Sequence, residues 1–295
     1  MGVNPFLDTT CFECMSRLAL SLAKLVNQEL EEAVLLAAKL MKGYSDAILA
    51  YYDDYVSLCE AVFDYTFKLL GDLDPYRRVK EASVKAALNL LPLAEKYASA
   101  SNGLENSVKV AVAANALDFG TGVYQVDLEK FEEIFREKLR EPLAVNDVEE
   151  LEKLVENAET ILYVLDNAGE CVLDRPLVCR LARAGRVVVA ARGGPVLNDA
   201  TVEEAARAGL GEYADLITTG ARLPCISLRK CDRRFLELLA KADVVVLKGQ
   251  GNYQSFYNIV RVRRKPTFYL FTPKCRPVAR LIKAPVGSLV AYRYR

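Results

Sequence analysis

The chain has 295 residues, 52% of them hydrophobic, and its 39 basic residues balance 39 acidic ones. This is the composition of a globular protein with one large core or two modest ones, and the zero net charge provides no global field for nucleic acid or an anionic membrane. The chain contains no histidine, which excludes Ser-His-Asp catalysis, Cys-His catalysis and histidine-ligated metal sites.

The apolar stretches have strand length or are interrupted by charges, and the opening sequence MGVNPFLDTT lacks the regions of a signal peptide. We therefore expect a cytoplasmic protein without a membrane or nucleic-acid partner. Eight cysteines do not indicate a disulfide scaffold in a chain of this length. Cys11 and Cys14 form a C-x-x-C pair that could bind zinc, undergo redox chemistry or simply pack in a helix, and no second C-x-x-C is present to complete a zinc site.

From about residue 12 to 158, apolar residues recur at intervals of three and four, which predicts helices and no convincing strand. Within the connection 71–78, Asp74 and Pro75 fit the N-cap and the first position of a helix. A second connection at 101–107 precedes helices expected near 105–117, 127–140 and 147–158. We expect residues 1–150 to form a helical cap domain.

After residue 160, apolar runs of four to six residues alternate with amphipathic stretches, which is the pattern of β-α-β units. This predicts an α/β fold with a doubly wound, mainly parallel sheet in a three-layer sandwich, a Rossmann-like catalytic domain over residues 151–295. The expected strands are 160–165, 186–191, 215–218, 243–247, 267–271 and 288–293. The expected helices are 171–184, 201–209, 232–241, 252–260 and 276–282.

Polar residues follow three of these strands, and the carboxyl ends of parallel strands are where ligands bind in open α/β sheets. Asp166 and Asn167 end the first strand, and Asp199 follows the second. Two carboxylates and an amide are oxygen ligands that suit magnesium or manganese and leave coordination positions for water or a phosphate oxygen. The alternative for each aspartate is that it caps the helix that follows.

Lys248 follows the strand VVVL and opens the segment GQGN, in which Gly249 and Gly251 would let backbone N–H groups approach an anion, with Asn252 beside them. Arg192 and Gly193 form a similar turn after the second strand. We expect both turns to contact a phosphate. The alternative for Lys248 is a tight turn with a lysine that faces solvent.

The sequence does not decide the roles of two further polar segments. Asn115 and Asp118 interrupt the apolar pattern of AANALDFG (113–120), so they either fasten a helix end or reach toward the cleft between the domains. The basic run RVRRKP (261–266) is interpreted as a solvated turn before the next strand.

The order of these segments along nearly the whole chain resembles the damage-control phosphatases, formerly catalogued as domain of unknown function 89, and their stand-alone microbial branch with an N-terminal C-x-x-C. The segments are CFEC (11–14), DPY (74–76), ANALDFG (114–120), DNAGE (166–170), RGGPVLNDAT (192–201), KGQGNY (248–253) and KC (274–275). The ordered set is far more specific than any one of its members.

The resemblance implies a metal-dependent phosphatase for small phosphorylated metabolites, among them sugar phosphates and phosphopantetheine-type compounds. It places the family's metal-binding Asp-Asn pair on Asp166 and Asn167, the third ligand on Asp199, and the phosphate-contacting lysine on Lys248. Two departures stand out. Gln254 occupies a position where KGMGNYE of many relatives has glutamate, and Ala114 replaces the glycine of the GN-x-x-DFG pattern.

The expected reaction is attack of water on a phosphomonoester, because a metal-bound carboxylate such as Asp166 is a poor nucleophile. Glu170 and Asp174 are nearby acids, and the sequence does not select either as the base. The alternatives are an S-adenosylmethionine-dependent carboxyl methyltransferase, against which the lack of G-x-G-x-x-G counts, and a non-catalytic protein that binds phosphometabolites. The sequence does not determine the natural substrate, the oligomeric state or the choice among magnesium, manganese, cobalt and nickel.

Overall fold

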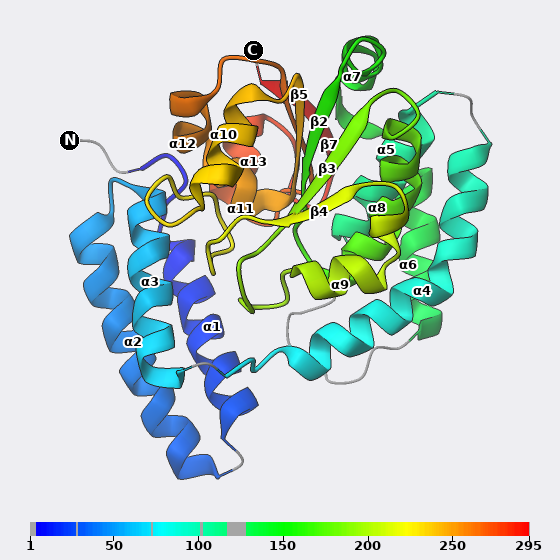
Figure 1. Cartoon of the computed structure of the whole chain (residues 1–295). Coiled ribbons are helices and arrows are strands. Elements are labelled where there is room, and N and C mark those ends of the chain that lie inside the picture. The colour runs from blue at the N-terminus through cyan, green and yellow to red at the C-terminus, as the bar shows by residue number, and fades with distance from the viewer. Residues whose placement is uncertain (1–3, 28, 72, 101–102, 117–127, 295) are drawn as a thin grey trace.

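A seven-stranded sheet forms the centre of the molecule in this computed structural model, which describes residues 4–27, 29–71, 73–100, 103–116 and 128–294 (Figure 1). The strand order is β1-β7-β6-β5-β2-β3-β4. Strands β6, β5, β2, β3 and β4 are parallel, whereas β7 is antiparallel to β6 and parallel to β1. The strands are β1 (Leu143–Asn146), β2 (Thr160–Val164), β3 (Arg186–Ala191), β4 (Asp215–Thr218), β5 (Val244–Lys248), β6 (Thr267–Phe271) and β7 (Leu289–Tyr294).

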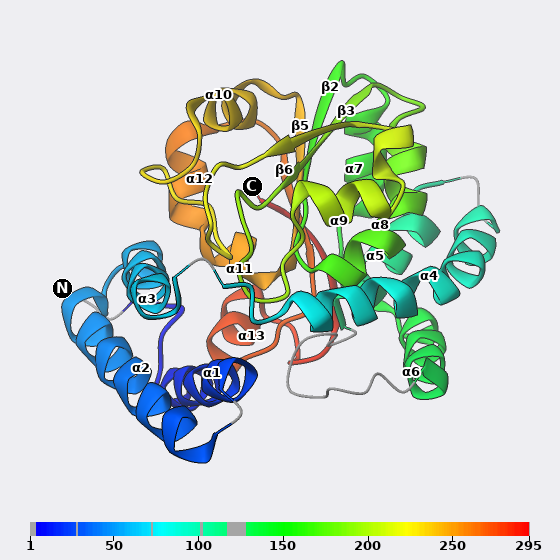
Figure 2. The same ribbon diagram turned by 60° about the horizontal axis from the view of Figure 1, so that its bottom comes forward.

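Helices cover both faces of the sheet, which confirms the predicted α/β class. On one face lie α4 (Arg77–Ser99), α5 (Glu105–Ala116), α6 (Leu128–Arg140), α7 (Val148–Val155), α8 (Ala168–Leu181) and α9 (Val202–Arg207). On the other lie α1 (Thr10–Val26), α2 (Leu30–Tyr51), α3 (Tyr55–Leu70), α10 (Arg233–Lys241), α11 (Gly249–Gln254), α12 (Phe256–Val262) and α13 (Arg276–Ile282). Figure 2 shows α1, α2 and α3 grouped beyond α13 at the side away from α4.

Strand alternation divides the apolar residues between two cores. In β2, Ile161 and Tyr163 enter the core beneath α4, α5 and α8, whereas Leu162 and Val164 enter the core on the opposite face. All four side chains are fully buried. This explains why the central strands are continuous apolar runs, since a parallel sheet that is covered on both faces exposes neither set of side chains.

The prediction that no strand precedes residue 160 is wrong. β1 is a four-residue strand, LAVN, that pairs with β7 at the edge of the sheet and alternates between half-buried and exposed residues. So short a segment, lying between two strongly amphipathic helices, carries too little alternation to be distinguished from helix by pattern alone.

The predicted helical unit of residues 1–150 is distributed over both faces of the sheet. Helices α4 and α5 share a core with the strands, α1 to α3 contribute to the other core, and β1 lies within the same range. The described packing shows no boundary near residue 150, so a separate cap domain stays a prediction. In the described part of the chain, no helix combines the length and apolar composition needed to cross a bilayer.

Candidate functional site

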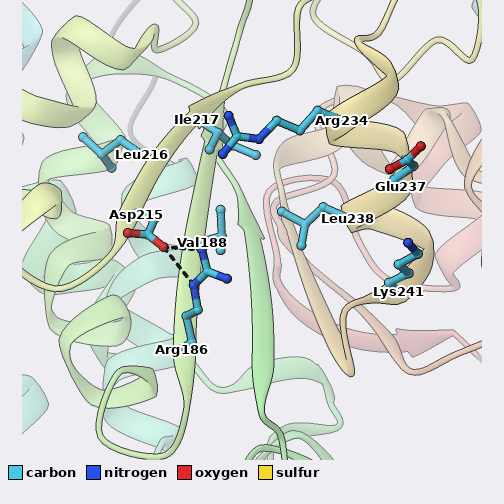
Figure 3. Close-up of a pocket in the computed structure, with 9 residues that line it drawn as sticks. All are labelled: Arg186, Val188, Asp215, Leu216, Ile217, Arg234, Glu237, Leu238 and Lys241. Atoms are coloured by element: carbon cyan, nitrogen blue, oxygen red, sulfur yellow. Dashed lines mark hydrogen bonds and ion pairs between the residues drawn. The ribbon is translucent and has the colours of Figure 1, made fainter.

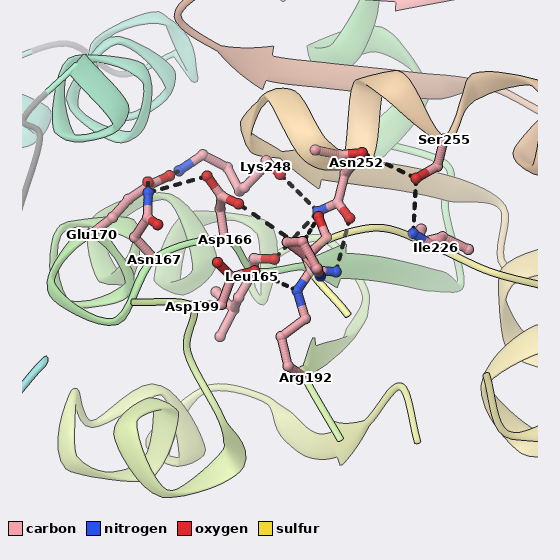
Figure 4. Close-up of polar contacts among 12 residues, drawn as sticks. Leu165, Asp166, Asn167, Glu170, Arg192, Asp199, Ile226, Lys248, Asn252 and Ser255 are labelled. Atoms are coloured by element: carbon pink, nitrogen blue, oxygen red, sulfur yellow. Dashed lines mark hydrogen bonds and ion pairs between the residues drawn. The ribbon is translucent and has the colours of Figure 1, made fainter. Parts of the chain in front are cut away.

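Two loops at the carboxyl ends of β2 and β3 bring the candidate metal ligands together (Figure 4). Asn167 and Asp199 form an isolated antiparallel bridge. The backbone N–H of Ala200 donates to the Asp166 carbonyl over 2.7 Å, and that of Ala168 donates to the Asn198 carbonyl over 2.8 Å. These backbone bonds fix the two loops against each other, so the three predicted ligands lie on one small area.

Neither aspartate is a helix cap. Helix α8 follows Asn167, whose side chain makes no cap hydrogen bond. Helix α9 is capped by Thr201 in a capping box with Glu204. The carboxylates of Asp166 and Asp199 therefore do not serve the helix ends that follow them.

The two carboxylates are buried and repel each other. Asp166 is 8% exposed and Asp199 is 3% exposed. Burial, together with the charges of Asp199 and Glu170, raises the pKa of Asp166 to about 7. Burial also raises the pKa of Asp199, although Arg192 opposes this shift. A pair of carboxylates held in this state gains from a divalent cation, which would neutralise both charges.

Arg192 is a fully buried support for Asp199. Its Nε donates to Asp199 Oδ2 over 2.7 Å, Nη1 donates to Asn252 Oδ1 over 3.0 Å and Nη2 donates to the Pro224 carbonyl over 3.1 Å. The guanidinium is thus occupied by protein acceptors. We predicted a phosphate contact for Arg192, but the structure directs its donors inward.

Lys248 lies behind the site, fully buried. Its Nζ donates to Glu170 and, over 2.6 Å, to Asp174 Oδ1, which also accepts from the Tyr163 hydroxyl over 2.9 Å. The charges of Asp174 and Glu170 raise the pKa of Lys248 although burial opposes this, so the ammonium stays charged. The expectation of an anion-facing or solvent-facing lysine is not met, because two protein carboxylates surround it.

Asn115 connects α5 to the site, whereas the cleft between domains that one of its two interpretations assumed stays a prediction. Its Nδ2 donates to Glu170 Oε2 over 2.8 Å and to Asp166 Oδ2 over 3.1 Å, while its Oδ1 accepts from the Thr272 N–H over 2.9 Å. Asn167 Nδ2 donates to the same two carboxylates, each over 3.2 Å. Two amides therefore orient Asp166. Asp118 lies outside the described residues.

The predicted anion-binding glycines serve close backbone packing. A Cβ on Gly193 would lie 2.3 Å from the Gly220 carbonyl carbon, and one on Gly251 would lie 2.1 Å from the Pro224 oxygen. Asn252 Nδ2 donates to the Lys248 carbonyl over 2.7 Å. These contacts stabilise the loops, and the sequence could not reveal them because the 220–224 segment is distant along the chain.

Gly249 differs from the other two glycines because it abuts a candidate ligand. Its φ is +78°, and an added Cβ would lie 2.0 Å from Asp166 Oδ2. Only glycine combines that backbone conformation with room for the carboxylate.

Comparison with known proteins places this arrangement in a family. A family model described as the damage-control phosphatase ARMT1-like domain matches residues 7–290. A damage-control phosphatase of Pyrococcus horikoshii is 34% identical over 290 residues, which are 96% of each chain. A damage-control phosphatase of Archaeoglobus fulgidus is 33% identical over 76% of this chain and 77% of that protein. The crystal structure of a protein of the domain-of-unknown-function-89 family from Pyrococcus horikoshii matches with a TM-score of 0.83 and 29% identity, over 98% of this chain and 99% of that one.

The chain belongs to the damage-control phosphatase family. This confirms the family that the ordered motifs indicated, and the branch with an N-terminal C-x-x-C stays a prediction. An uncharacterised protein of Methanocaldococcus jannaschii is also 32% identical, over 98% of this chain and 96% of its own length.

In this family member, Lys274 is a cation near the site that the residue-level argument missed. It is exposed, in the loop after β6, and its charge lowers the pKa of both Asp166 and Asp199 against the larger effect of burial. The motif KC (274–275) contained the signal, but spacing alone gives no reason to prefer one lysine over another.

The cysteine pair of this family member contributes no metal site to the described structure. All eight cysteines are free. Burial raises the pKa of the Cys11 and Cys14 thiols, which favours the neutral form over the thiolate that a metal needs. Among the described residues, no three Asp, Glu or Cys side chains are grouped to hold a metal ion. The candidate donor set is therefore two carboxylates and one amide.

The basic run 261–266 is only partly the solvated turn that we expected. Arg263 is buried, and its guanidinium donates to the carbonyls of Leu239 over 3.0 Å and Ala242 over 2.7 Å. This arginine fastens the end of α10.

Two surface pockets differ in their relation to the carboxylates. A pocket of about 500 Å³ lies where β3 and β4 begin, at the opposite sheet end from Asp166, and Arg186 and Asp215 form an ion pair in it (Figure 3). A pocket of about 480 Å³ lies beside the loop that carries Asp199 and shares Arg192 and Gly193 with the site. We assign function to the carboxylate end because titratable groups with shifted pKa values converge there.

Proposed function

We propose that the chain is a metal-dependent phosphatase that hydrolyses small phosphorylated metabolites. The observation that carries this proposal is the pairing of two buried carboxylates, Asp166 and Asp199, with the amide of Asn167 at the ends of adjacent strands. Membership in the damage-control phosphatase family supports the reaction class. The names of the relatives favour hydrolysis over methyl transfer, and no observation on the described residues favours the second.

The donor chemistry fits a divalent cation. Asp166 and Asp199 are held close enough for the charge of Asp199 to raise the pKa of Asp166. A bound cation would remove the repulsion between the two carboxylates. Nδ2 of Asn167 is used in hydrogen bonds to Asp166 and Glu170, which leaves its Oδ1 as the donor atom that we assign to the metal. Oxygen donors of this kind suit magnesium or manganese, and cobalt and nickel remain in the proposal. The bound metal would polarise the phosphoryl group.

The protein side chains would hold and neutralise the reacting groups. Hydrolysis forms a bond from water oxygen to phosphorus, breaks the ester P–O bond and releases an alcohol and inorganic phosphate. Lys274 is the exposed ammonium that we assign to the phosphate oxygens, in place of the buried Lys248. Lys248 and Arg192 would instead hold Glu170 and Asp199 in place.

The base is not assigned to Glu170 or Asp174. Both are fully buried, and both accept from the Lys248 ammonium. Neither carboxylate reaches solvent in the described structure, so neither is placed to take a proton from an attacking water.

The proposal is tested with p-nitrophenyl phosphate and a panel of magnesium, manganese, cobalt and nickel. We expect metal-dependent release of phosphate that excess chelator stops, and a loss of at least about 100-fold in Asp166→Ala and Asp199→Ala, because each removes a ligand. Asp64→Ala is the matched control, since Asp64 is an exposed acid that pairs with Lys230 on the surface. Full activity in chelator, or in either site variant, would refute the proposal.

A further inference from the structure

Gln250 contacts the backbone of Lys274, the exposed lysine whose charge lowers the pKa of Asp166 and Asp199. The side chain of Gln250, on α11, accepts from the Lys274 N–H through Oε1 over 2.8 Å. Its Nε2 donates to Gln254 Oε1 over 3.3 Å and lies 3.4 Å from Cys275 Sγ. Gln250 therefore joins the short helix after β5 to the loop after β6.

That loop is held at two points, each connected to Asp166. At Thr272, the backbone N–H donates to Asn115, whose amide donates in turn to Asp166. At Lys274, the backbone N–H donates to Gln250, which follows Gly249 directly, and Gly249 packs against the Asp166 carboxylate. The position of the Lys274 backbone is thus set relative to Asp166 and not only by the end of β6.

We propose that Gln250 is a positioning residue that holds the Lys274 ammonium in register with the carboxylate pair. This inference rests on the proposed function, in which Lys274 binds the phosphate oxygens. Without the bond to Gln250, the Lys274 N–H has lost its side-chain acceptor, and the link between Pro273 and α13 can turn. A displacement of about 1 Å in such a group can lower the rate by about 100-fold.

The Lys274 N–H sets which way the Gln250 amide faces, and Gln254 matches that orientation. An amide presents an oxygen at one side and an NH₂ group at the other, and only the oxygen can accept from the Lys274 N–H. Gln254 Oε1 and Cys275 Sγ are both acceptors on the NH₂ side of Gln250. In a flipped Gln250 amide, the NH₂ group would face the Lys274 N–H, and the oxygen would face the acceptors Gln254 Oε1 and Cys275 Sγ, so these contacts would be lost. The Lys274 N–H therefore selects one orientation of the Gln250 amide, and Gln254, four residues further along α11, provides an acceptor for its NH₂ group.

The test compares Gln250→Met, which keeps the length of the side chain and removes its hydrogen-bonding groups, with Lys274→Met and the double variant. Turnover of p-nitrophenyl phosphate gives kcat and KM, and calorimetry gives the Kd of inorganic phosphate with manganese present. We expect Gln250→Met to weaken phosphate binding and raise KM by about 5- to 20-fold, with Tm close to wild type. In the Lys274→Met background the same substitution should change phosphate affinity by less than about twofold.

Further variants separate positioning from a general packing effect. Gln254→Glu keeps an acceptor for Gln250, so its phosphate affinity should be closer to wild type than that of Gln254→Met. Lys265→Met, at the opposite end of β6 where Lys265 pairs with Asp243 on the surface, controls for the loss of a lysine.

The outcomes distinguish this inference from the proposed function. Turnover in the wild type with an unchanged phosphate Kd in Gln250→Met overturns the role of Gln250 and leaves the phosphatase intact. Effects of Gln250→Met that are equal with and without Lys274 also overturn it. If the wild type binds phosphate but hydrolyses no ester, the proposed function fails, and weaker binding in Gln250→Met still supports positioning. A wild type that does neither overturns both.

Discussion

The guanidinium of Arg192 donates from Nε to Asp199 Oδ2 over 2.7 Å, and both side chains are almost completely buried. Because Arg192 also bonds Asn252 and the Pro224 carbonyl, it fixes Asp199 to two other loops. A lysine offers a point charge without the planar fork and cannot make all three contacts.

We therefore expect Arg192→Lys to raise the manganese concentration needed for half-maximal activity by about 10- to 100-fold. This is the range found when the support of a metal ligand is removed. The measurement is phosphate release as a function of manganese concentration. Arg186→Lys is the control, because Arg186 forms an exposed pair with Asp215 at the other end of the sheet. A metal dependence of Arg192→Lys equal to that of the wild type would show that Asp199 does not need this support.

A second prediction concerns Gly249, where positive φ and contact with Asp166 occur together. In Gly249→Ala the new Cβ would lie 2.0 Å from Asp166 Oδ2, so the carboxylate or the turn must move. We expect activity to fall by at least about 100-fold, since a shift of about 1 Å can cost that much.

Gly287→Ala provides a matched comparison for Gly249→Ala. Gly287 also has positive φ, +83°, but an added Cβ meets nothing within 4 Å. It should cost about 1–2 kcal/mol of stability from backbone strain alone and leave the specific activity unchanged. Thermal unfolding and specific activity of both variants check this pair, and equal activity losses would contradict the steric argument.

The sequence predicted the six strands after residue 160 because short apolar runs alternate there with amphipathic stretches. The runs are richest in β-branched residues in β2, β3 and β5, which a sheet covered on both faces requires to be apolar. The proximity of Asp166, Asn167 and Asp199 followed from the same logic, since parallel strands end at one edge. What the sequence could not supply was the direction of each polar side chain. Lys248 has an anion-binding context in sequence, yet Glu170 and Asp174 from α8 surround its ammonium.

Contacts distant along the chain account for the other differences. The roles of Gly193 and Gly251 depend on residues 220–224, which approach them only in the folded molecule. Lys274 became a candidate because folding brings the loop after β6 beside Asn115 and Gln250. Neither relation has a local sequence signature.

A third prediction concerns a buried ion cluster that joins α4 to α9. Lys80 Nζ lies 2.8 Å from Asp74 Oδ2 and 2.9 Å from Glu204 Oε1, and Lys80 is buried. The prediction that Asp74 is the N-cap is wrong, because α4 begins at Arg77 and Tyr76 holds the N-cap position, although Asp74 Oδ1 accepts from the Tyr76 N–H over 3.2 Å. Burial raises the pKa of Glu204, but hydrogen bonds from Thr201 and Lys80 outweigh it and leave the pKa lowered.

Lys80→Met should therefore lower the free energy of unfolding by about 3 kcal/mol at pH 7, because it leaves the buried Glu204 and the half-buried Asp74 without their cation. A lowered pKa contributes stability above its unfolded value, and that stability is lost as the pH falls through the folded pKa. The difference between wild type and Lys80→Met should consequently shrink below about pH 4.5, the ordinary value for Glu204. Urea unfolding at pH 7 and pH 4 measures it, with the exposed pair variant Lys153→Met as a control expected to change little. A difference that grows on acidification would contradict this.

The last prediction concerns the stability of the metal-free protein. Burial and the neighbouring charges raise the pKa of Asp166 from its ordinary 3.8 to about 7. Between these values the folded state binds more protons than the unfolded state, so the free energy of unfolding should fall as the pH rises from about 4 through 7. Asp166→Asn removes the charge, and at pH 8 without metal it should be more stable than wild type by at least about 1 kcal/mol, with a smaller margin at pH 5.

Manganese should then stabilise the wild type at pH 8 and stabilise Asp166→Asn much less, because binding to the folded state alone adds to stability. Chemical unfolding at both pH values, with and without manganese, gives the comparison, and Asp64→Asn on the surface is the control. Equal stabilisation of both proteins by manganese would mean that the metal binds elsewhere, and a flat pH profile for the metal-free wild type would mean that Asp166 keeps its ordinary pKa.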